Sequence, residues 1–192
     1  MIRRVGGPGK VASDAFLGRA VMSIKTVKTA RSLSGDLRIY SAPKALLRHI
    51  QWSLNAIFEE KVKLEWVVQP MVAGAYACEL QWRGNTECAS KIASTLRSWH
   101  FVRFEVREFP TEGGEGVLYR CTPTLGMHQA VTASTGDVMI HENRILTILS
   151  QSVGYESLRK NMEAALGTEW DVELESYRRG LEEEQSPLWI SI

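Results

Sequence analysis

Alternating apolar and polar side chains predict three β-strands, because successive side chains of a strand point to opposite faces of a sheet. The segments are KLEWVVQ (63–69), GAYACELQWRG (74–84) and HFVRFEVREF (100–109), preceded by the short β-rich run LRIYS (37–41). Apolar residues at helical spacing predict one helix over 43–60 and another from Thr86 to about Ser98. The order β-α-β-β-α-β predicts an α+β, ferredoxin-like fold, with both helices on one face of a four-stranded antiparallel sheet.

Strand parity assigns the two faces of this sheet. The face expected to lie under the helices carries Leu64, Trp66, Val68, Tyr76, Cys78, Leu80, Trp82, Val102, Phe104 and Val106. The opposite face is of mixed charge, and we expect cross-strand pairs there, such as Arg38 with Glu105. Ala75 and Ala77 leave room on it for the C-terminal segment or a second subunit. Tyr40 is the single ring expected on this face, which disfavours RNA binding by base stacking.

Residues 111–192 predict a β-hairpin followed by a small helical cluster. The expected strands are VLYRCT (117–122), HQAVTA (128–133) and VMI (138–140), and the expected helices run over 142–152, 155–166 and from Glu169 to about Arg179. Gly167 is expected to end the second of these helices, and SPLWISI (186–192) to form a docking strand. This part is too apolar to stand alone. We therefore expect the core (35–110) and residues 111–192 to form one globular unit.

Charge separates an N-terminal arm, residues 1–34, from the rest of the chain. The protein has 192 residues and a formal net charge of +1, which gives no overall signal for binding a polyanion. Residues 1–31, however, carry seven Lys or Arg residues and a single Asp. We expect a basic, disordered tail. The alternative is a tether for nucleic acid or an acidic partner.

The three cysteines form no CxxC pair, which suits thiols in a reducing compartment. No apolar run approaches the ~20 residues that span a bilayer, and the cytoplasm is the expected location. We predict neither a metal nor a cofactor. His141-Glu142 is not part of HExxH, because Ile145 stands where the second histidine belongs.

No established catalytic motif occurs, so the candidate ligand-binding residues come from one proline turn and one helix–strand junction. His128 follows the turn, near Thr122, Thr124 and Asp137 in sequence, and could act as a base or a binding donor. Trp99 and His100 could line the same pocket. The structural alternative is a histidine at a hairpin rim, threonines that suit strands and turns, and a buried tryptophan beside a hydrogen-bonded histidine.

Cys88 lies at a predicted helix N-terminus, where its thiol could have a lowered pKa and react. The structural alternative is a small residue that suits the start of a helix. The EEE run (182–184) fits a solvated face.

Several stretches in one order resemble an uncharacterised actinobacterial family, the domain of unknown function three-one-four-five. They are YSAPKALLRHIQWSL (40–54), LEWVVQP (64–70), ELQWRG (79–84), ASKIASTLRSWHFVRFEV (89–106), YRCTPTLGMHQAVTASTGD (119–137) and GTEWDVELESYR (167–178). The resemblance covers about 35–192 and leaves out the basic arm. It implies a cytoplasmic protein without assigned activity, whose gene often lies beside genes of type II fatty-acid synthesis.

These observations favour a non-enzymatic binding or assembly module, which associates with itself or with a protein partner; the resemblance suggests a connection to fatty-acid synthesis. One alternative is a ligand-binding protein or enzyme with a pocket near residues 122–128. A second alternative is nucleic-acid binding through the basic arm. No membrane association is expected.

Overall fold

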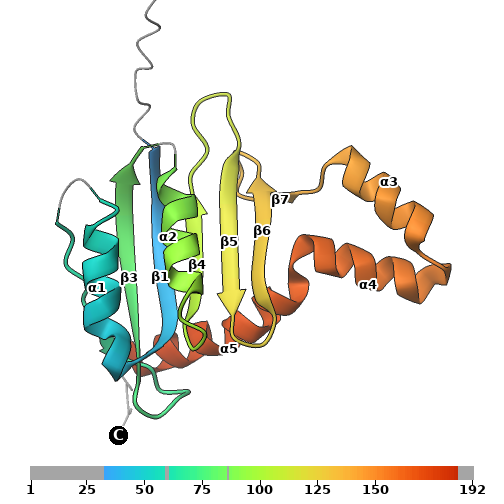
Figure 1. Ribbon diagram of the computed structural model, residues 1–192. Helices are drawn as coiled ribbons and strands as arrows, with labels where there is room; N and C mark the ends of the chain where they lie inside the picture. The colour runs from blue at the N-terminus through green and yellow to red at the C-terminus, as the bar shows by residue number, and fades with distance from the viewer. Residues whose placement is uncertain (1–32, 59–60, 86, 186–192) are drawn as a thin grey trace, which may run out of the picture.

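The protein is an α+β structure built on one antiparallel β-sheet (Figure 1). The computed structural model describes residues 33–58, 61–85 and 87–185, and in these ranges the sheet has seven strands in the order β2-β3-β1-β4-β5-β6-β7. The strands are β1 (Leu33–Pro43), β2 (Val67–Val68), β3 (Ala75–Gly84), β4 (Arg103–Glu108), β5 (Gly116–Thr122), β6 (Gly126–Thr132) and β7 (Val138–Met139). Strands β5 to β7 thus extend the sheet from β4.

Two segments differ from the boundaries that the sequence predicted at the ends of the chain. Leu33 and Ser34, expected in the N-terminal arm, begin β1, where they pair with Gly84 and Arg83 of β3. The rest of the arm (1–32) and the expected docking strand 186–192 lie outside the described residues.

Strand β2 is much shorter than the predicted 63–69, because side chains of helix α1 (Leu47–Asn55) bind the backbone just before it. Gln51 donates from Nε2 to the carbonyl oxygen of Val62 at 2.7 Å, and its Oε1 accepts from the N–H of Leu64 at 2.9 Å. Only Val67 and Val68 then pair with β3. Helix α1 itself follows a 3-10 turn, η1 (Lys44–Leu46), and is shorter than the predicted 43–60.

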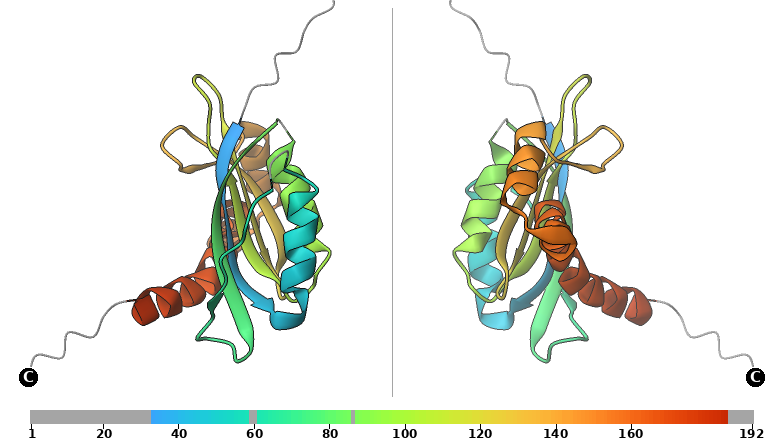
Figure 2. Two further views of the ribbon diagram at one scale, coloured as in Figure 1. Left: turned by 90° about the vertical axis from the view of Figure 1, so that its left-hand side faces the viewer. Right: turned by 90° about the vertical axis from the view of Figure 1, so that its right-hand side faces the viewer.

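Helices α1 and α2 (Cys88–Arg97) cover one face of the sheet (Figure 2). The main core lies between them and the strands, and Ile50, Leu54, Ile92, Leu96 and Phe104 are fully buried in it. Trp82 is 2% exposed in this core and Trp66 packs against its edge. The prediction that both tryptophans face the helices is confirmed.

The opposite face of the sheet is crossed by the long helix α5 (Thr168–Gln185), as Figure 2 shows. Of the two coverings considered for the mixed-charge face, the C-terminal segment or a second subunit, the structure shows the first. Helices α3 (Glu142–Gln151) and α4 (Gly154–Leu166) form a hairpin that stands out beyond β7 (Figure 1). Gly167 ends α4 in the left-handed conformation, with φ of 76°, as predicted. That turn directs the chain back under the sheet as α5.

Candidate functional site

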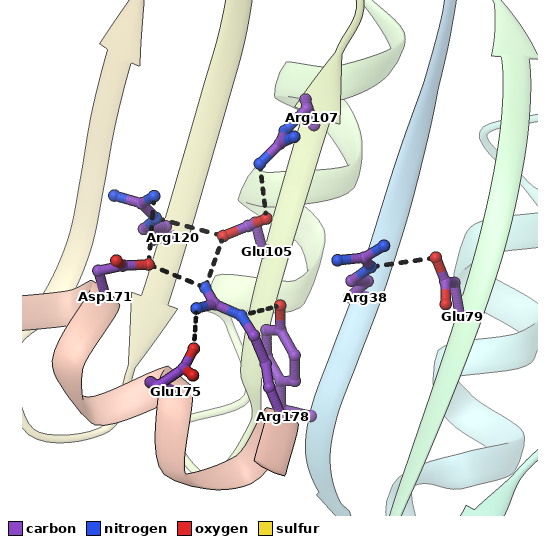
Figure 3. A network of polar contacts seen from close by, with 9 residues as sticks. Arg38, Glu79, Glu105, Arg107, Arg120, Asp171, Glu175 and Arg178 are labelled. Carbon is purple, nitrogen blue, oxygen red and sulfur yellow. Dashed lines mark hydrogen bonds and ion pairs between the residues drawn. The ribbon is translucent and has the colours of Figure 1, made fainter. Parts of the chain in front are cut away.

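A cluster of charged side chains lies between α5 and the sheet (Figure 3). It brings together residues of β1, β4, β5 and α5, and we call it the Glu105 cluster: Tyr40, Glu105, Arg107, Arg120, Asp171, Glu175 and Arg178. Glu105 is at its centre and is only 2% exposed. A carboxylate so deeply buried must be paired and hydrogen-bonded to be tolerated.

Three arginines meet that requirement at Glu105. Arg120 donates from Nε to Oε2 at 3.2 Å, and Arg178 donates from Nη2 to the same oxygen at 3.3 Å. Arg107 donates from Nη2 to Oε1 at 3.3 Å. Two of these arginines come from the sheet and the third comes from α5, so the buried carboxylate joins the helix to the strands.

Arg178 makes three further hydrogen bonds through its guanidinium group. Its Nε donates to the hydroxyl oxygen of Tyr40 at 3.0 Å, its Nη1 to Glu175 at 2.8 Å and its Nη2 to Asp171 at 3.0 Å. The guanidinium carbon lies 5.5 Å from the centre of the Tyr40 ring. Burial opposes a charge on Arg178, but the hydrogen bonds to Tyr40, Glu175 and Asp171 outweigh burial and raise its pKa.

The expected pair between Arg38 and Glu105 does not form, and this prediction was wrong. The two residues do face each other across β1 and β4, as the prediction required. Arg38 instead donates from Nε to Glu79 at 3.0 Å, its direct neighbour across β1 and β3. The reason is that α5 covers Glu105 and supplies Arg178, whereas Arg38 stays at the more open part of the face.

Outside the Glu105 cluster, two more polar attachments of α5 lie within the described residues. Arg103 of β4 donates from Nε to Glu173 at 2.9 Å and lies over the Tyr177 ring at 4.8 Å. Trp170 donates from Nε1 to the carbonyl oxygen of Gly126 at 2.9 Å. The helix is thus held from its first turns to Arg178.

His128 supports the junction between α4 and α5. Its side chain is 9% exposed, and its Nε2 lies 3.1 Å from the carbonyl oxygen of Ala165, which identifies Nε2 as the protonated nitrogen. Its ring centre lies 5.0 Å from that of Trp170, and Gly167 is so close that a Cβ there would come within 2.5 Å of the ring. Burial lowers the pKa of His128, which favours the neutral ring.

The other predicted site residues do not gather around His128. Thr122 is buried, and its Oγ1 accepts from the N–H of Leu125 at 3.0 Å inside the turn, while Thr124 is exposed. Asp137 is exposed in the 134–137 turn and accepts from Thr135 at 2.7 Å. Strand parity places Thr122 and His128 on the α5 face.

Trp99 and His100 lie on the other side of the sheet. Trp99 packs against the main core under α1 and α2, and His100 is exposed. Two hollows in the described part of the chain lie elsewhere. One of about 490 Å³ runs along α4 and the start of α5, and one of about 440 Å³ lies between α2 and the residues just after α1. Neither is lined by a predicted site residue.

Of the two alternatives for Cys88, the structure favours the small residue at the start of a helix, since its pKa is not lowered. Burial, together with the charge of Glu108, raises the pKa of Cys88 to about 11. Burial likewise raises the pKa of Cys78 to about 12 and that of Cys121 above its ordinary value. All three thiols are buried and free, so the thiolate form that nucleophilic chemistry requires is disfavoured.

The α3–α4 hairpin exposes large apolar side chains to solvent. Leu146 and Leu149 of α3 are 54% and 53% exposed, Val153 in the bend is 90% exposed, and Tyr155 of α4 is 72% exposed. We call these four residues the hairpin surface. In contrast, Ile148 points inward and is 3% exposed. Among the described residues, the hairpin thus buries Ile148 and leaves the four residues of the hairpin surface exposed.

The sequence pattern did not single out Glu105, Arg120 and Arg178 as a site, although strand parity placed Glu105 on the right face. In the sequence, a charged strand residue that faces solvent cannot be distinguished from one that a helix covers. One signal was available: the face with Arg103, Glu105 and Arg107 was expected to be covered, and charges on a covered face need partners.

The fold and the site define a class: an antiparallel α+β protein with a helix fixed over the sheet by a buried ion cluster. The model of the family described as "Protein of unknown function (DUF3145)" matches residues 37–191, and the chain belongs to this family. No curated protein and no solved structure matches it. Within residues 33–58, 61–85 and 87–185, no helix is long and apolar enough to cross a membrane, and no three potential ligand side chains gather to hold a metal.

Proposed function

We propose that the protein is a non-enzymatic interaction and assembly module, and that the hairpin surface is its docking surface. The observation that carries this proposal is the exposure of Leu146, Leu149, Val153 and Tyr155 on one projecting hairpin. Contiguous exposed apolar side chains mark sites of protein association, because burying them on a partner removes apolar area from water. Tyrosine is enriched among residues that dominate such interfaces.

In the closed hairpin, two hydrogen bonds hold these side chains in a defined arrangement. Asn161 of α4 donates from Nδ2 to the Ser152 hydroxyl at 2.9 Å, and that hydroxyl donates to the carbonyl oxygen of Ile148 at 2.6 Å. These bonds tie α3, the bend and α4 together. A docking surface that is ordered before binding loses less conformational entropy when the partner arrives.

The chemistry of the buried polar groups also supports a binding role. The charge of Glu105 is balanced by arginines, and the cysteine thiols have raised pKa values. His128 is hydrogen-bonded to Ala165 and lies against the Trp170 ring. A general base or nucleophile must reach a substrate, and these groups are enclosed by the protein.

The experiment is an affinity capture with three baits: wild type, Leu146→Glu/Leu149→Glu, and the control Val67→Glu. Val67 is 45% exposed at the far edge of the sheet, so the control adds a charge at a similarly exposed apolar position. We expect wild type and the control to recover the same proteins, and the double variant to lose them. Recovery of the same proteins by all three baits would overturn the proposal.

We propose that β1 to β4 with α1 and α2 form a ferredoxin-like unit, which is supported by the strand order β2-β3-β1-β4 and by two helices on one face. We propose the cytoplasm as the location, supported by three buried free thiols. The proposed partner is a second copy of this chain or, as the resemblance suggests, a protein of type II fatty-acid synthesis.

A further inference from the structure

Helix α5 is attached to the sheet by several directional polar contacts. Arg178, Asp171 and Glu173 each pair with residues of the strands, and Trp170 donates to the backbone of Gly126. Among the described side chains of α5, Leu174 is the apolar one that is fully buried. Complementary charges of this kind are typical of interfaces between separate polypeptides, where they fix register and partner choice.

The connection that carries α5 to its position contains a tight bend. Ser152 and Val153 are extended between α3 and α4, and Gly154 has φ of 78°, a left-handed conformation that other residues adopt at a cost. If these three residues became helical, α3 and α4 would join into a single helix over 142–166, about 37 Å long. The start of α5 would then lie far from its own sheet.

The hairpin surface is consistent with such an opening. Leu146, Leu149 and Val153 follow the spacing i, i+3, i+7, so on a continuous helix they would share one stripe. In the closed hairpin these side chains are exposed, at 54%, 53% and 90%. On two opened helices lying side by side, the stripes could bury one another.

We infer that α5 is exchangeable, and that its partner is a second copy of this chain: α5 of each copy occupies the sheet of the other in a reciprocal dimer. The inference rests on the proposed function, since it identifies the protein that docks at the hairpin surface. The second copy is the fitting occupant because its α5 carries Asp171, Glu173 and Arg178 at the spacing that Arg120, Arg103 and Glu105 require. Exchange of an identical element between copies reproduces the contacts between α5 and the sheet and is a low-cost route to a dimer.

The test uses complementary charge reversals in two differently tagged copies. Glu105→Arg places a cation against Arg178, and Arg178→Glu places an anion against Glu105. In each variant alone, α5 and its own sheet therefore carry like charges at this contact. Co-expression allows a mixed exchanged dimer. In one half of it the two substituted side chains meet as an ion pair between α5 and the sheet. In the other half the wild-type Glu105 and Arg178 meet. We expect co-purification of the two tags and a mass twice the 21.6 kDa of the chain by light scattering. The control is the double variant Glu105→Arg/Arg178→Glu in one chain, because its own α5 and its own sheet again carry opposite charges at this contact. Two tags that never co-purify would overturn the exchange.

A second variant keeps the inference testable if either charge reversal fails to fold. Gly154→Ala disfavours the left-handed bend and favours the continuous helix, so it should raise the dimer fraction several-fold over wild type at equal concentration. The control Gly136→Ala alters a glycine with φ of 91° in the β6–β7 turn and should leave the dimer fraction unchanged. An unchanged dimer fraction in Gly154→Ala would count against the exchange. If exchange fails while capture still depends on Leu146 and Leu149, the exchange alone is overturned and the proposed function stands.

Discussion

Arg178 of α5 places its Nε 3.0 Å from the hydroxyl oxygen of Tyr40 in β1, although the two residues are 138 positions apart in sequence. The same guanidinium group reaches Glu105, so one side chain joins the last helix to two central strands. Burial, followed by the charge of Glu105, raises the pKa of Tyr40. The tyrosine hydroxyl is therefore protonated over the whole neutral range and acts as a neutral partner of the arginine.

Removing this side chain should destabilise the protein. Arg178→Met keeps the aliphatic length but leaves the Tyr40 hydroxyl without its donor and Glu105 with two arginines instead of three. We expect a loss of about 2–3 kcal/mol in the free energy of unfolding, measured by urea denaturation. Arg179→Met is the matched control, because Arg179 is 69% exposed and pairs with Glu175 alone; its change should stay within about 0.5 kcal/mol. Equal effects of the two substitutions would contradict the role assigned to the cluster.

His128 should make the stability of the protein depend on pH. The unfolded histidine titrates near 6.5, and burial lowers the pKa in the folded state. Between these two values the unfolded state binds more protons, so the free energy of unfolding falls as the pH drops through 6.5 and levels off below the folded pKa. The slope from this residue cannot exceed about 1.4 kcal/mol per pH unit.

The pH prediction is checked with His128→Gln, which retains an N–H for Ala165 but does not titrate. Unfolding curves between pH 5 and 7.5 should show a smaller pH dependence for this variant than for wild type. His100→Gln alters an exposed histidine and should behave like wild type. A pH dependence that is the same in His128→Gln would exclude His128 as its source.

Gly167 should be intolerant of any side chain, for two separable reasons. Its φ of 76° disfavours other residues, and an added Cβ would lie 2.5 Å from the His128 ring. Gly74 has the same φ but nothing within 4 Å of an added Cβ. We expect Gly74→Ala to cost about 1 kcal/mol and Gly167→Ala about 2–4 kcal/mol. Similar losses in thermal or urea unfolding would show that the contact with His128 is unimportant.

The three cysteines should be unreactive in the folded protein. Their thiols are buried, and the pKa values of Cys88 and Cys78 are raised to about 11 and about 12. At pH 8, a thiol reagent such as Ellman's should react with all three only as fast as the protein opens, and at once in denaturant. Rapid modification of one thiol in the native protein would reject this description of its surroundings.

The sequence predicted the two faces of the core strands well. Trp82 and Phe104 were assigned to the face under the helices, and both are buried there. This worked because the period of two in a strand is a local property that the covalent chain enforces. Strand β2 was overestimated because Gln51, eleven residues before Val62, competes for the backbone, and local alternation carries no information on such a contact.

The candidate site was predicted less well. His128 was singled out and is indeed at a special position, yet its neighbours are Ala165, Gly167 and Trp170 rather than Thr124 or Asp137. Residues near one another in sequence on a hairpin point to different faces or into solvent. The partners of His128 lie at the junction of α4 and α5, almost forty residues later in the sequence. No local pattern predicts that contact.

The sequence by itself determined the class of fold, the identity of the buried strand faces and the turns, because these depend on side-chain periods and backbone preferences within a few residues. Only the tertiary structure decided that Glu105 pairs with Arg178 and not with Arg38. A charged side chain can pair with any opposite charge close to it. The position of α5 across the sheet decides which opposite charges lie close to Glu105. The ion cluster and the projecting hairpin are consequences of that placement.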